Sequence, residues 1–490
     1  MGLESILDLK ESPFKEEPRG CMYQDLNLDQ IIGQIENAWG DKVRQYFNYL
    51  PADEECSRYR GDVTRDIMCD QVYDILYRFV NAYRESVKIG AKREVVRMAV
   101  QKHIYLIREI DIYCNALVTL KMELEKCDLR SEGMKSLVEY LDTYLQSDQY
   151  QAMEERAKDL RGQLDNVRLK IAFENNQVIV EILTDSTEQR ESIGSIAGPF
   201  LDNVDLTVFE QEVLMIFQKK RPDLLKAAEL FYKKFSSYAQ ETVRRFAEEV
   251  CYYLAYYAFV KKMEAYDYSF AHPENAEIGS MEGREVYDLA LACANVSKDL
   301  PVVRNDFAYD TGKTFFVLTG PNQGGKTTFA RCLGQLVFFA RMGLMVPAKS
   351  ARIPYIHRIL THFSVEESVE TGRGKLKEEL MRLAPMMEER FEKAFVVINE
   401  LFTTAANYDA NIMGKNVLKR FINAKCMGIY VTHLTELAEG SEGVVSLRAM
   451  LDENGVQTFE IRRGAAEDTA CAANQVNKYR LTYEQLKERL

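Results

Sequence analysis

The residues best suited to chemistry form one glycine-rich run, Gly320-Pro321-Asn322-Gln323-Gly324-Gly325-Lys326-Thr327, followed by Thr328. This run, called the glycine loop below, fits the pattern GxxxxGK[ST] in full. In that pattern the glycines let backbone N–H groups close around phosphates, the lysine bridges the β- and γ-phosphates, and the hydroxyl holds Mg²⁺. A glycine-rich turn that matches by chance is the alternative.

The segments on either side of the glycine loop have the character that phosphate binding requires. Residues 314–319 (TFFVLT) predict a buried strand, and residues 328–343 (TFARCLGQLVFFARMG) predict a helix. The N-terminus of such a helix adds a partial positive charge to the backbone donors of the loop. We therefore expect the loop to bind ATP or ADP together with Mg²⁺.

Two further apolar strands end in polar residues. Residues 395–398 lead into Asn399 and Glu400, and residues 428–432 lead into His433. The carboxyl ends of parallel strands converge on a bound nucleotide. We therefore expect Glu400 to position the attacking water, His433 to sense the γ-phosphate beside Lys326, and Asn399 to join Thr327 at the metal. A satisfied histidine at a strand end is the alternative for His433.

The residues of these motifs and their spacing resemble the motifs of the MutS family of DNA mismatch-repair ATPases. The matching segments are TGPNQGGKTT, Gly343 to Ala348 (GLMVPA), Ile356 to Ile359 (IHRI), Tyr408-Asp409, Thr432-His433 with Glu436-Leu437, and the upstream Asn305. The resemblance covers residues 302–466. It implies an α/β P-loop NTPase domain of the MutS/ABC-like type, preceded by a mainly α-helical core and lever domain with a small β insertion.

The resemblance also implies roles for residues beyond the glycine loop. Val302 and Val303 fall where the family packs adenine, and Phe459 falls where the family has a ring-stacking histidine. Phe459 can stack on adenine, or it can be an ordinary core residue. The family acts as a dimer with composite nucleotide sites, and its serine that crosses the interface falls at Gly374. Arg373 and Lys375 can supply charge there instead, or form a solvated basic turn.

Departures from the family pattern affect the expected chemistry. Asn399 replaces an aspartate, so Mg²⁺ binding should be weaker and hydrolysis slow. Phe402-Thr403-Thr404 replaces a G-R-G segment. The sequence offers no counterpart to the family's mismatch-reading domain, because its bare Phe-x-Glu tripeptides lack the family's context.

Apolar periodicity predicts the organisation of the rest of the chain. Residues 62–127 and 206–266 carry apolar side chains at three- and four-residue spacing, which indicates long helices, with Pro222 breaking the second series. Residues 167–183 alternate as a β-hairpin with a turn at Asn175-Asn176. We predict a helical core and lever-like domain over 1–275, with a clamp-like insertion near 165–185. The ATPase domain then covers 276–490 and ends in short helices over 474–490, which in the family help two subunits pair.

Composition limits the protein classes. With 490 residues, 47% of them hydrophobic, and a net charge of −12, the chain suits a folded protein that does not coat DNA non-specifically. No apolar stretch reaches the roughly 20 residues of a membrane span, and the N-terminal residues do not form a leader. We expect a cytoplasmic protein without a membrane partner. The ten cysteines lack zinc spacing and read as reduced thiols.

Two basic stretches raise the question of nucleic acid. One comprises Arg84, Lys88, Lys92, Arg93, Arg97, Lys102 and Arg108; the other comprises Lys219, Lys220, Arg221, Lys226, Lys233, Lys234, Arg244 and Arg245, interleaved with Phe231, Tyr232, Phe235 and Tyr238. They can bind DNA, or they can be solvated helix faces whose aromatics point inward.

Three functions remain open. The first is a MutS-like homodimeric ATPase that moves helical arms on DNA, in mismatch repair or a recombination-related process. The second is a weakly catalytic nucleotide switch that binds a protein partner. The third is a dimeric scaffold in which nucleotide is structural.

Overall fold

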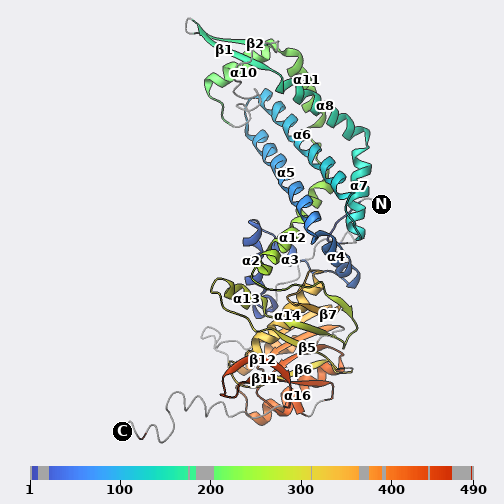
Figure 1. Cartoon of the computed structure of the whole chain (residues 1–490), viewed down its shortest axis with the longest axis vertical. Helices are drawn as coiled ribbons and strands as arrows, with labels where there is room; N and C mark the ends of the chain where they lie inside the picture. Colours follow the sequence, from blue (N-terminus) through green and yellow to red (C-terminus); the bar gives the residue numbers. More distant parts are fainter. Residues whose placement is uncertain are drawn as a thin grey trace. The chain divides into compact units, whose positions relative to one another are not determined.

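The computed structural model describes residues 3–8, 21–174, 177–183, 204–310, 312–363, 375–388, 393–439, 442–465 and 487. The chain divides into two compact units, each described by itself (Figure 1). Unit 1 comprises Met1–Ile6 and Asp66–Leu254, and unit 2 comprises Leu7–Arg65 and Ala255–Leu490. A mainly helical N-terminal region is thus followed by an α/β region, as expected. The boundary near residue 275 stays a prediction.

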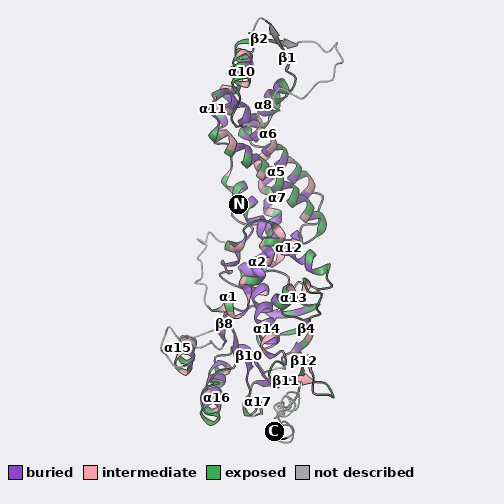
Figure 2. Ribbon diagram, turned by 90° about the vertical axis from the view of Figure 1, so that its left-hand side faces the viewer, coloured by how far each residue is buried: buried purple, intermediate pink, exposed green. Residues whose placement is uncertain are grey.

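Unit 1 is built mainly from long helices. They are α5 (Asp70–Val95), α6 (Ala99–Leu124), α7 (Glu132–Leu145), α8 (Asp148–Asp165), α10 (Val208–Lys220), α11 (Pro222–Phe235) and residues 241–254 of α12 (Glu241–Glu264). Three residues join α5 to α6, so the two helices fold back on each other along their length (Figure 1). The periodic apolar residues Val72, Ile75, Leu76, Phe79 and Val80 are all buried, and Figure 2 shows the buried faces of these helices. The predicted long helices are confirmed.

Local sequence signals set where several of these helices begin. Ser131 and Ser147 accept hydrogen bonds from backbone N–H groups in the first turns of α7 and α8. Thr207 and Glu210 form a reciprocal capping box at α10. Pro222 is the first residue of α11, where its missing N–H costs nothing, so it separates α10 from α11 as expected.

The predicted β-hairpin is present in unit 1. Strand β1 (Arg168–Glu174) pairs antiparallel with β2 (Gln177–Leu183), with Arg168 opposite Leu183 and Glu174 opposite Gln177. The predicted turn residues Asn175 and Asn176 lie outside the described residues.

A buried polar cluster joins the helices of unit 1. The Glu109 carboxylate of α6 accepts a hydrogen bond from Arg93 Nε at 2.8 Å and from the Tyr238 hydroxyl at 3.0 Å. Burial raises the pKa of Glu109, and the charge of Arg93 opposes that rise. Gly90 lies inside α5 without interrupting it; a Cβ there would lie 2.8 Å from Glu109 Oε1, so glycine admits the carboxylate.

Unit 2 contains two sheets. The smaller has the order β3 (Glu274–Ala276), β7 (Ser350–Pro354), β4 (Glu282–Val286) and β5 (Asn305–Ala308). The larger has the order β12 (Gln457–Arg463), β11 (Val444–Leu451), β6 (Phe315–Thr319), β10 (Met427–Val431), β9 (Ala394–Asn399) and β8 (Arg358–Phe363). The helices that lie between these strands along the chain are α13 (Leu289–Val296), α14 (Lys326–Arg341), α15 (Lys375–Glu388), α16 (Asn407–Asn423) and α17 (Glu436–Glu439).

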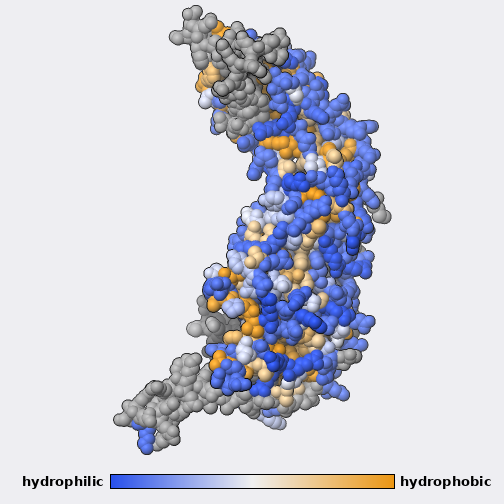
Figure 3. All heavy atoms as spheres, viewed as in Figure 1, coloured by the Kyte–Doolittle hydropathy of each residue, from blue (hydrophilic) through white to orange (hydrophobic). Residues whose placement is uncertain are grey.

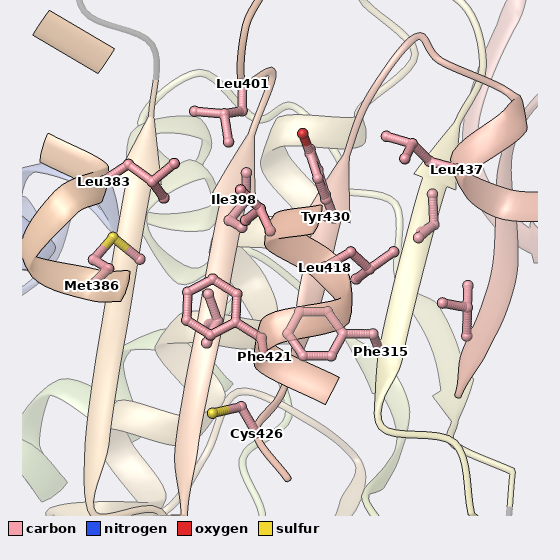
Figure 4. Close-up of a cluster of buried hydrophobic side chains, with 14 of the residues drawn as sticks. Phe315, Leu383, Met386, Ile398, Leu401, Leu418, Phe421, Cys426, Tyr430 and Leu437 are labelled. Atoms are coloured by element: carbon pink, nitrogen blue, oxygen red, sulfur yellow. The ribbon is translucent and has the colours of Figure 1, made fainter. Parts of the chain in front are cut away.

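The larger sheet is parallel except at one edge. Strands β11, β6, β10, β9 and β8 pair in parallel, and β12 pairs antiparallel with β11. Every residue of β6, β9 and β10 is buried, as expected of strands covered on both faces. On one face, side chains from α15 and α16 form an apolar cluster with the strands (Figure 4).

The N-terminal part of unit 2 packs beside α14. It contributes α1 (Met22–Asp25), α2 (Leu28–Trp39), α3 (Arg44–Phe47) and α4 (Glu54–Ile67), of which the last continues into unit 1. Gln335 Nε2 donates to the Leu26 carbonyl at 3.0 Å, and the Ser57 hydroxyl donates to the Arg341 carbonyl at 2.8 Å. These bonds attach residues far apart in sequence to one helix.

Neither a membrane-spanning helix nor a disulfide is found among the residues that the structure describes. Within these ranges, no helix combines the length and apolar character that crossing a bilayer requires. Each cysteine in the described part of the chain is a free thiol.

We expect the buried Arg93–Glu109 pair to stabilise unit 1 far more than an exposed pair does. Arg93→Ala should lower the free energy of unfolding by about 3 kcal/mol, because it leaves a buried carboxylate without its cation. Arg78→Ala breaks an exposed pair with Glu123 and should cost less than about 1 kcal/mol. Urea unfolding followed by circular dichroism measures both. Equal losses would contradict the importance of burial at Glu109.

Candidate functional site

The glycine loop joins β6 to α14, as the sequence predicts. Gly320 and Gly325 have φ angles of 125° and 85°, in the region that favours glycine. A Cβ on Gly320 would lie 3.0 Å from the Ala449 Cβ, and one on Gly324 would lie 3.1 Å from the same atom. The loop therefore needs glycine both for its turn and for its close approach to β11.

Lys326 lies at the first position of α14 and is only 4% exposed. Its Nζ donates hydrogen bonds to the carbonyl oxygens of Gly320 at 2.8 Å and Pro321 at 2.9 Å. The ammonium group is thus enclosed by the loop that precedes it. An anion bound in the loop would meet this charge at the N-terminus of α14.

Thr327 and Asn399 meet at the end of β9. The Thr327 hydroxyl donates to Asn399 Oδ1 at 2.9 Å. Both side chains offer neutral oxygens, of the kind that Mg²⁺ accepts when phosphate oxygens complete its shell. Among the described side chains, no group of three His, Cys, Asp or Glu residues is close enough to hold a metal. A metal here would therefore depend on Thr327, Asn399 and the ligand.

Glu400 and His433 meet at the ends of two neighbouring strands. Asn399 of β9 is in register with Val431 of β10, and the Glu400 N–H donates to the Val431 carbonyl at 2.9 Å. His433 Nε2 lies 3.0 Å from Glu400 Oε1, and the side chains are 44% and 28% exposed. The two groups that we expect to act on water and γ-phosphate are thus in hydrogen-bond contact.

A pocket of about 430 Å³ lies beside the glycine loop, within the usual size of ligand sites. Of the predicted residues, Val302, Val303, Asn322, Gln323, Gly324, Gly325, Lys326, Thr327, Thr328, Glu400 and Phe459 line it. Gly320, Pro321, Asn399 and His433 are outside its lining. Asn399 and His433 reach lining residues through their bonds to Thr327 and Glu400.

Phe459 of β12 is a pocket residue and not a core residue. Its side chain is 46% exposed, and its ring lies against Gly325 of the loop. Asn305 holds this part of β12, because its Nδ2 donates to the Phe459 carbonyl at 3.3 Å and its Oδ1 accepts from the Ile461 N–H at 2.7 Å. The sequence marked Asn305 only as a motif position; its bonds to β12 were not predictable from spacing.

Asp288 is a pocket residue that the sequence interpretation missed. It is 4% exposed and lines the pocket at the start of α13. Its Oδ1 accepts hydrogen bonds from Gln335 Nε2 at 2.9 Å and from the Leu291 N–H at 3.1 Å. Burial raises the pKa of Asp288. An aspartate directly before the apolar run LALACANV is a helix N-cap signal, and that signal could have located it.

The backbone that carries Glu400 adopts an unusual conformation. Glu400 and Phe402 have φ angles of 53° and 64°, in the left-handed region that is unfavourable for residues with a side chain. Each such residue costs about 1 kcal/mol or more unless its surroundings hold it. Leu401 and Phe402 are 3% and 2% exposed, so the turn places two apolar side chains in the core.

Some residues with a predicted role lie outside the residues that the structure describes. Arg373 and Gly374 fall in the range 364–374, and nothing is described of the Lys375 side chain. Their role across a subunit interface stays a prediction. The short helices expected over 474–490 also fall outside the described residues, apart from residue 487.

Several residues of the two basic stretches of unit 1 take part in ion pairs, among them Arg93 with Glu109 and Arg221 with Asp223. Lys233 pairs with Glu229, and Arg244 pairs with Glu241 and Glu248. Of the interleaved aromatics, Phe231, Phe235 and Tyr238 are buried, which confirms for these three that they point inward, and Tyr232 is half-buried. Exposed lysines outside these ion pairs lie at 88, 219, 220, 226 and 234. Hydrophilic residues cover most of the coloured part of unit 1 seen in Figure 3.

Comparison with known proteins gives a match that includes the glycine loop. Residues 316–469 match the family model described as MutS domain V. The chain is similar to proteins named DNA mismatch repair protein MutS. It is 26% identical to that of Fervidobacterium nodosum over 247 residues, 50% of this chain and 29% of the relative. For Syntrophomonas wolfei the identity is 29% over 39% of this chain and 23% of the relative. For the relative from a Thermotoga species the identity is 32%, over 28% of this chain and 17% of the relative. The chain thus spans less than a third of these relatives.

His362 makes the stability of unit 2 depend on pH. It lies on β8 with no exposed surface, and its Nε2 is 3.2 Å from the Glu379 carbonyl oxygen. Burial, helped by the charge of Arg382, lowers its pKa from 6.5 to about 4. Between pH 6.5 and pH 4 the imidazole of His362 is therefore protonated in the unfolded chain but neutral in the folded chain. The free energy of unfolding that is present above pH 6.5 is lost as the pH falls toward 4.

We expect His362→Gln to flatten this dependence, because glutamine keeps a donor but does not titrate. Melting temperatures measured between pH 7 and pH 4 should fall less steeply for this variant. Burial also lowers the pKa of His272 to about 4. Part of the decrease in melting temperature with falling pH should therefore remain in this variant. His357→Gln, at an exposed position, is the control. Parallel curves for His362→Gln and wild type would contradict the assignment.

Proposed function

Because this chain belongs to the MutS family through its domain V, we propose that it binds ATP with Mg²⁺ and hydrolyses it to ADP and phosphate. The proposed domain is a P-loop NTPase of the MutS/ABC-like type. One observation carries the proposal: Lys326, the Thr327–Asn399 pair and the Glu400–His433 pair meet at one sheet edge beside a pocket of about 430 Å³.

Nucleotide binding follows from the loop and the pocket wall. The backbone N–H groups of the glycine loop and the start of α14 receive the phosphates. Lys326 then exchanges its two carbonyl partners, Gly320 and Pro321, for phosphate oxygens. The adenine lies between the apolar residues Val302 and Val303 and the ring of Phe459, which all line the pocket.

Thr327 and Asn399 are the residues that would hold Mg²⁺. The ion, when bound, would neutralise charge on the phosphate oxygens. The oxygens of Thr327 and Asn399 are already 2.9 Å apart, so the pair fits such a role. Neither side chain carries a charge, however, and we therefore propose weak metal binding and slow turnover.

Hydrolysis requires a positioned water and a proton acceptor. The Glu400 carboxylate orients the water and accepts its proton as the water oxygen bonds to the γ-phosphorus and ADP leaves with the bridging oxygen. His433 donates from Nε2 either to Glu400, at 3.0 Å, or to the γ-phosphate. A change of partner at His433 then reports whether the γ-phosphate is present.

We further propose a homodimer with composite nucleotide sites, in which nucleotide state moves the helices of unit 1 on DNA. The names of the relatives support DNA mismatch repair as the setting. We propose a recombination-related process as the alternative setting, and the cytoplasm as the location. The exposed Lys219, Lys220 and Lys226 of α10 and α11 offer a local phosphate-binding surface.

A weakly catalytic nucleotide switch that binds a protein partner is the second candidate. Two observations favour it: the neutral Asn399 at the metal position, and the ion pairs that occupy Arg93, Lys233 and Arg244 in the basic stretches.

We expect Lys326→Ala and Glu400→Gln to separate binding from hydrolysis. Lys326→Ala removes the charge under the phosphates and should abolish binding of a fluorescent ATP analogue. Glu400→Gln should leave that binding intact but lower phosphate release by at least about 100-fold. Glu436→Gln, an exposed glutamate on α17, should do neither. Unaltered phosphate release in Glu400→Gln would remove the role given to Glu400.

Charge reversal on α10 and α11 tests the DNA proposal. Lys219→Glu, Lys220→Glu and Lys226→Glu together should weaken duplex binding and flatten its salt dependence by about 3 in log–log slope. The matched control reverses the exposed Lys126, Lys135 and Lys158 elsewhere in unit 1. Gel shifts on plain, mismatched and branched DNA measure the effect. If wild type binds none of them even at about 50 mM salt, the protein-partner switch is the better reading.

A further inference from the structure

The proposed catalytic carboxylate stands on a turn that is held from a distant element. Residues 400–402 follow β9, and both Glu400 and Phe402 are in the left-handed region. Glycine adopts this region freely, and the family pattern has a glycine at this place. Here the position carries a phenylalanine ring that is 2% exposed. The conformation must therefore be maintained by contacts.

Glu379 of α15 provides one of these contacts. It is 1% exposed, and its Oε2 accepts a hydrogen bond from the Phe402 N–H at 3.1 Å. Its own backbone carbonyl lies 3.2 Å from His362 Nε2 on β8. Glu379, 23 positions before Phe402, is thus held by β8 through its backbone carbonyl, while its side chain holds the turn that follows β9.

Glu379 lies beside a largely apolar cluster. Leu383 and Met386 of the same helix extend into the cluster that contains Leu401 and Tyr430 (Figure 4). The Tyr430 hydroxyl has no hydrogen-bond partner among the described residues, and burial together with the negative charge of Glu379 raises its pKa. For packing alone, an apolar side chain would suit this position better than a carboxylate.

We propose that Glu379 is a positioning residue, whose carboxylate locks the 400–402 turn and so keeps Glu400 against His433 at the sheet edge. This inference rests on the proposed ATP hydrolysis. A carboxylate that is displaced by an ångström loses most of its ability to orient water. The lock on the Phe402 N–H therefore determines turnover while leaving the phosphate loop unaffected, because no loop residue takes part in it.

Three variants of the full chain test the proposal. Glu379→Leu keeps the volume and suits the apolar cluster but cannot accept the hydrogen bond. Glu379→Gln keeps an oxygen acceptor. Lys377→Ala, at an exposed position of α15, is the matched control. We expect Glu379→Leu to lower kcat by about tenfold or more with the KM for ATP changed less than about twofold. Glu379→Gln should recover most of the rate.

Hydrogen exchange at the Phe402 amide gives a readout that does not need turnover. Exchange should accelerate in Glu379→Leu and stay slow in Glu379→Gln and Lys377→Ala. If wild type releases no phosphate, the proposed hydrolysis fails, while this exchange pattern still decides whether Glu379 holds the turn. If wild type hydrolyses ATP and Glu379→Leu matches it, the positioning role is wrong. Loss of folding in Glu379→Leu would assign Glu379 a structural role only and would overturn the proposal as well.

Discussion

The parallel pairing of β6, β10 and β9 is the constraint on which the site depends. Val431 of β10 is in register with Leu318 of β6 on one side and with Asn399 of β9 on the other. The three strands therefore end at the same level, and the residues that follow them emerge at one edge. A shift in register of either pair would separate Glu400 from His433 or Asn399 from Thr327.

The antiparallel edge of the same sheet supplies what the parallel strands cannot. Strand β12 returns beside β11 and places Phe459 against the loop, while Asn305 of the smaller sheet fixes it by two hydrogen bonds. Ala449 of β11 approaches the loop so closely that a Cβ on Gly320 or Gly324 would lie 3.0 or 3.1 Å from its own Cβ, which favours glycine at both positions. The pocket is therefore formed jointly by both sheets of unit 2.

Features that local pattern controls were predictable from the sequence, and features set by distant packing were not. Buried parallel strands read as continuous apolar runs, so the strands before Gly320, Asn399 and His433 could be located. The attachment of residues 7–65 to unit 2 could not, because it uses backbone carbonyls such as that of Leu26, which leave no trace in residue type. Glu379 was missed for a related reason: an isolated acid in sequence does not reveal that remote segments bury it. Asp288 could have been located as a helix N-cap, but its burial could not.

The departures from the family pattern in this site affect one another physically. With Asn399 neutral, Glu400 is the one carboxylate in the pocket lining near Thr327 within the described residues, apart from the N-capping Asp288. In the phosphoryl transfer that we propose, less fixed charge for a metal makes the position of that carboxylate matter more, because positioning and electrostatics are the main sources of rate in such reactions. A phenylalanine in place of glycine at 402 stiffens the turn, since its ring is anchored in the core and its N–H is held by Glu379. The loss of charge at Asn399 thus coincides with rigidity at Phe402, a combination that suits the slow turnover we propose for this site.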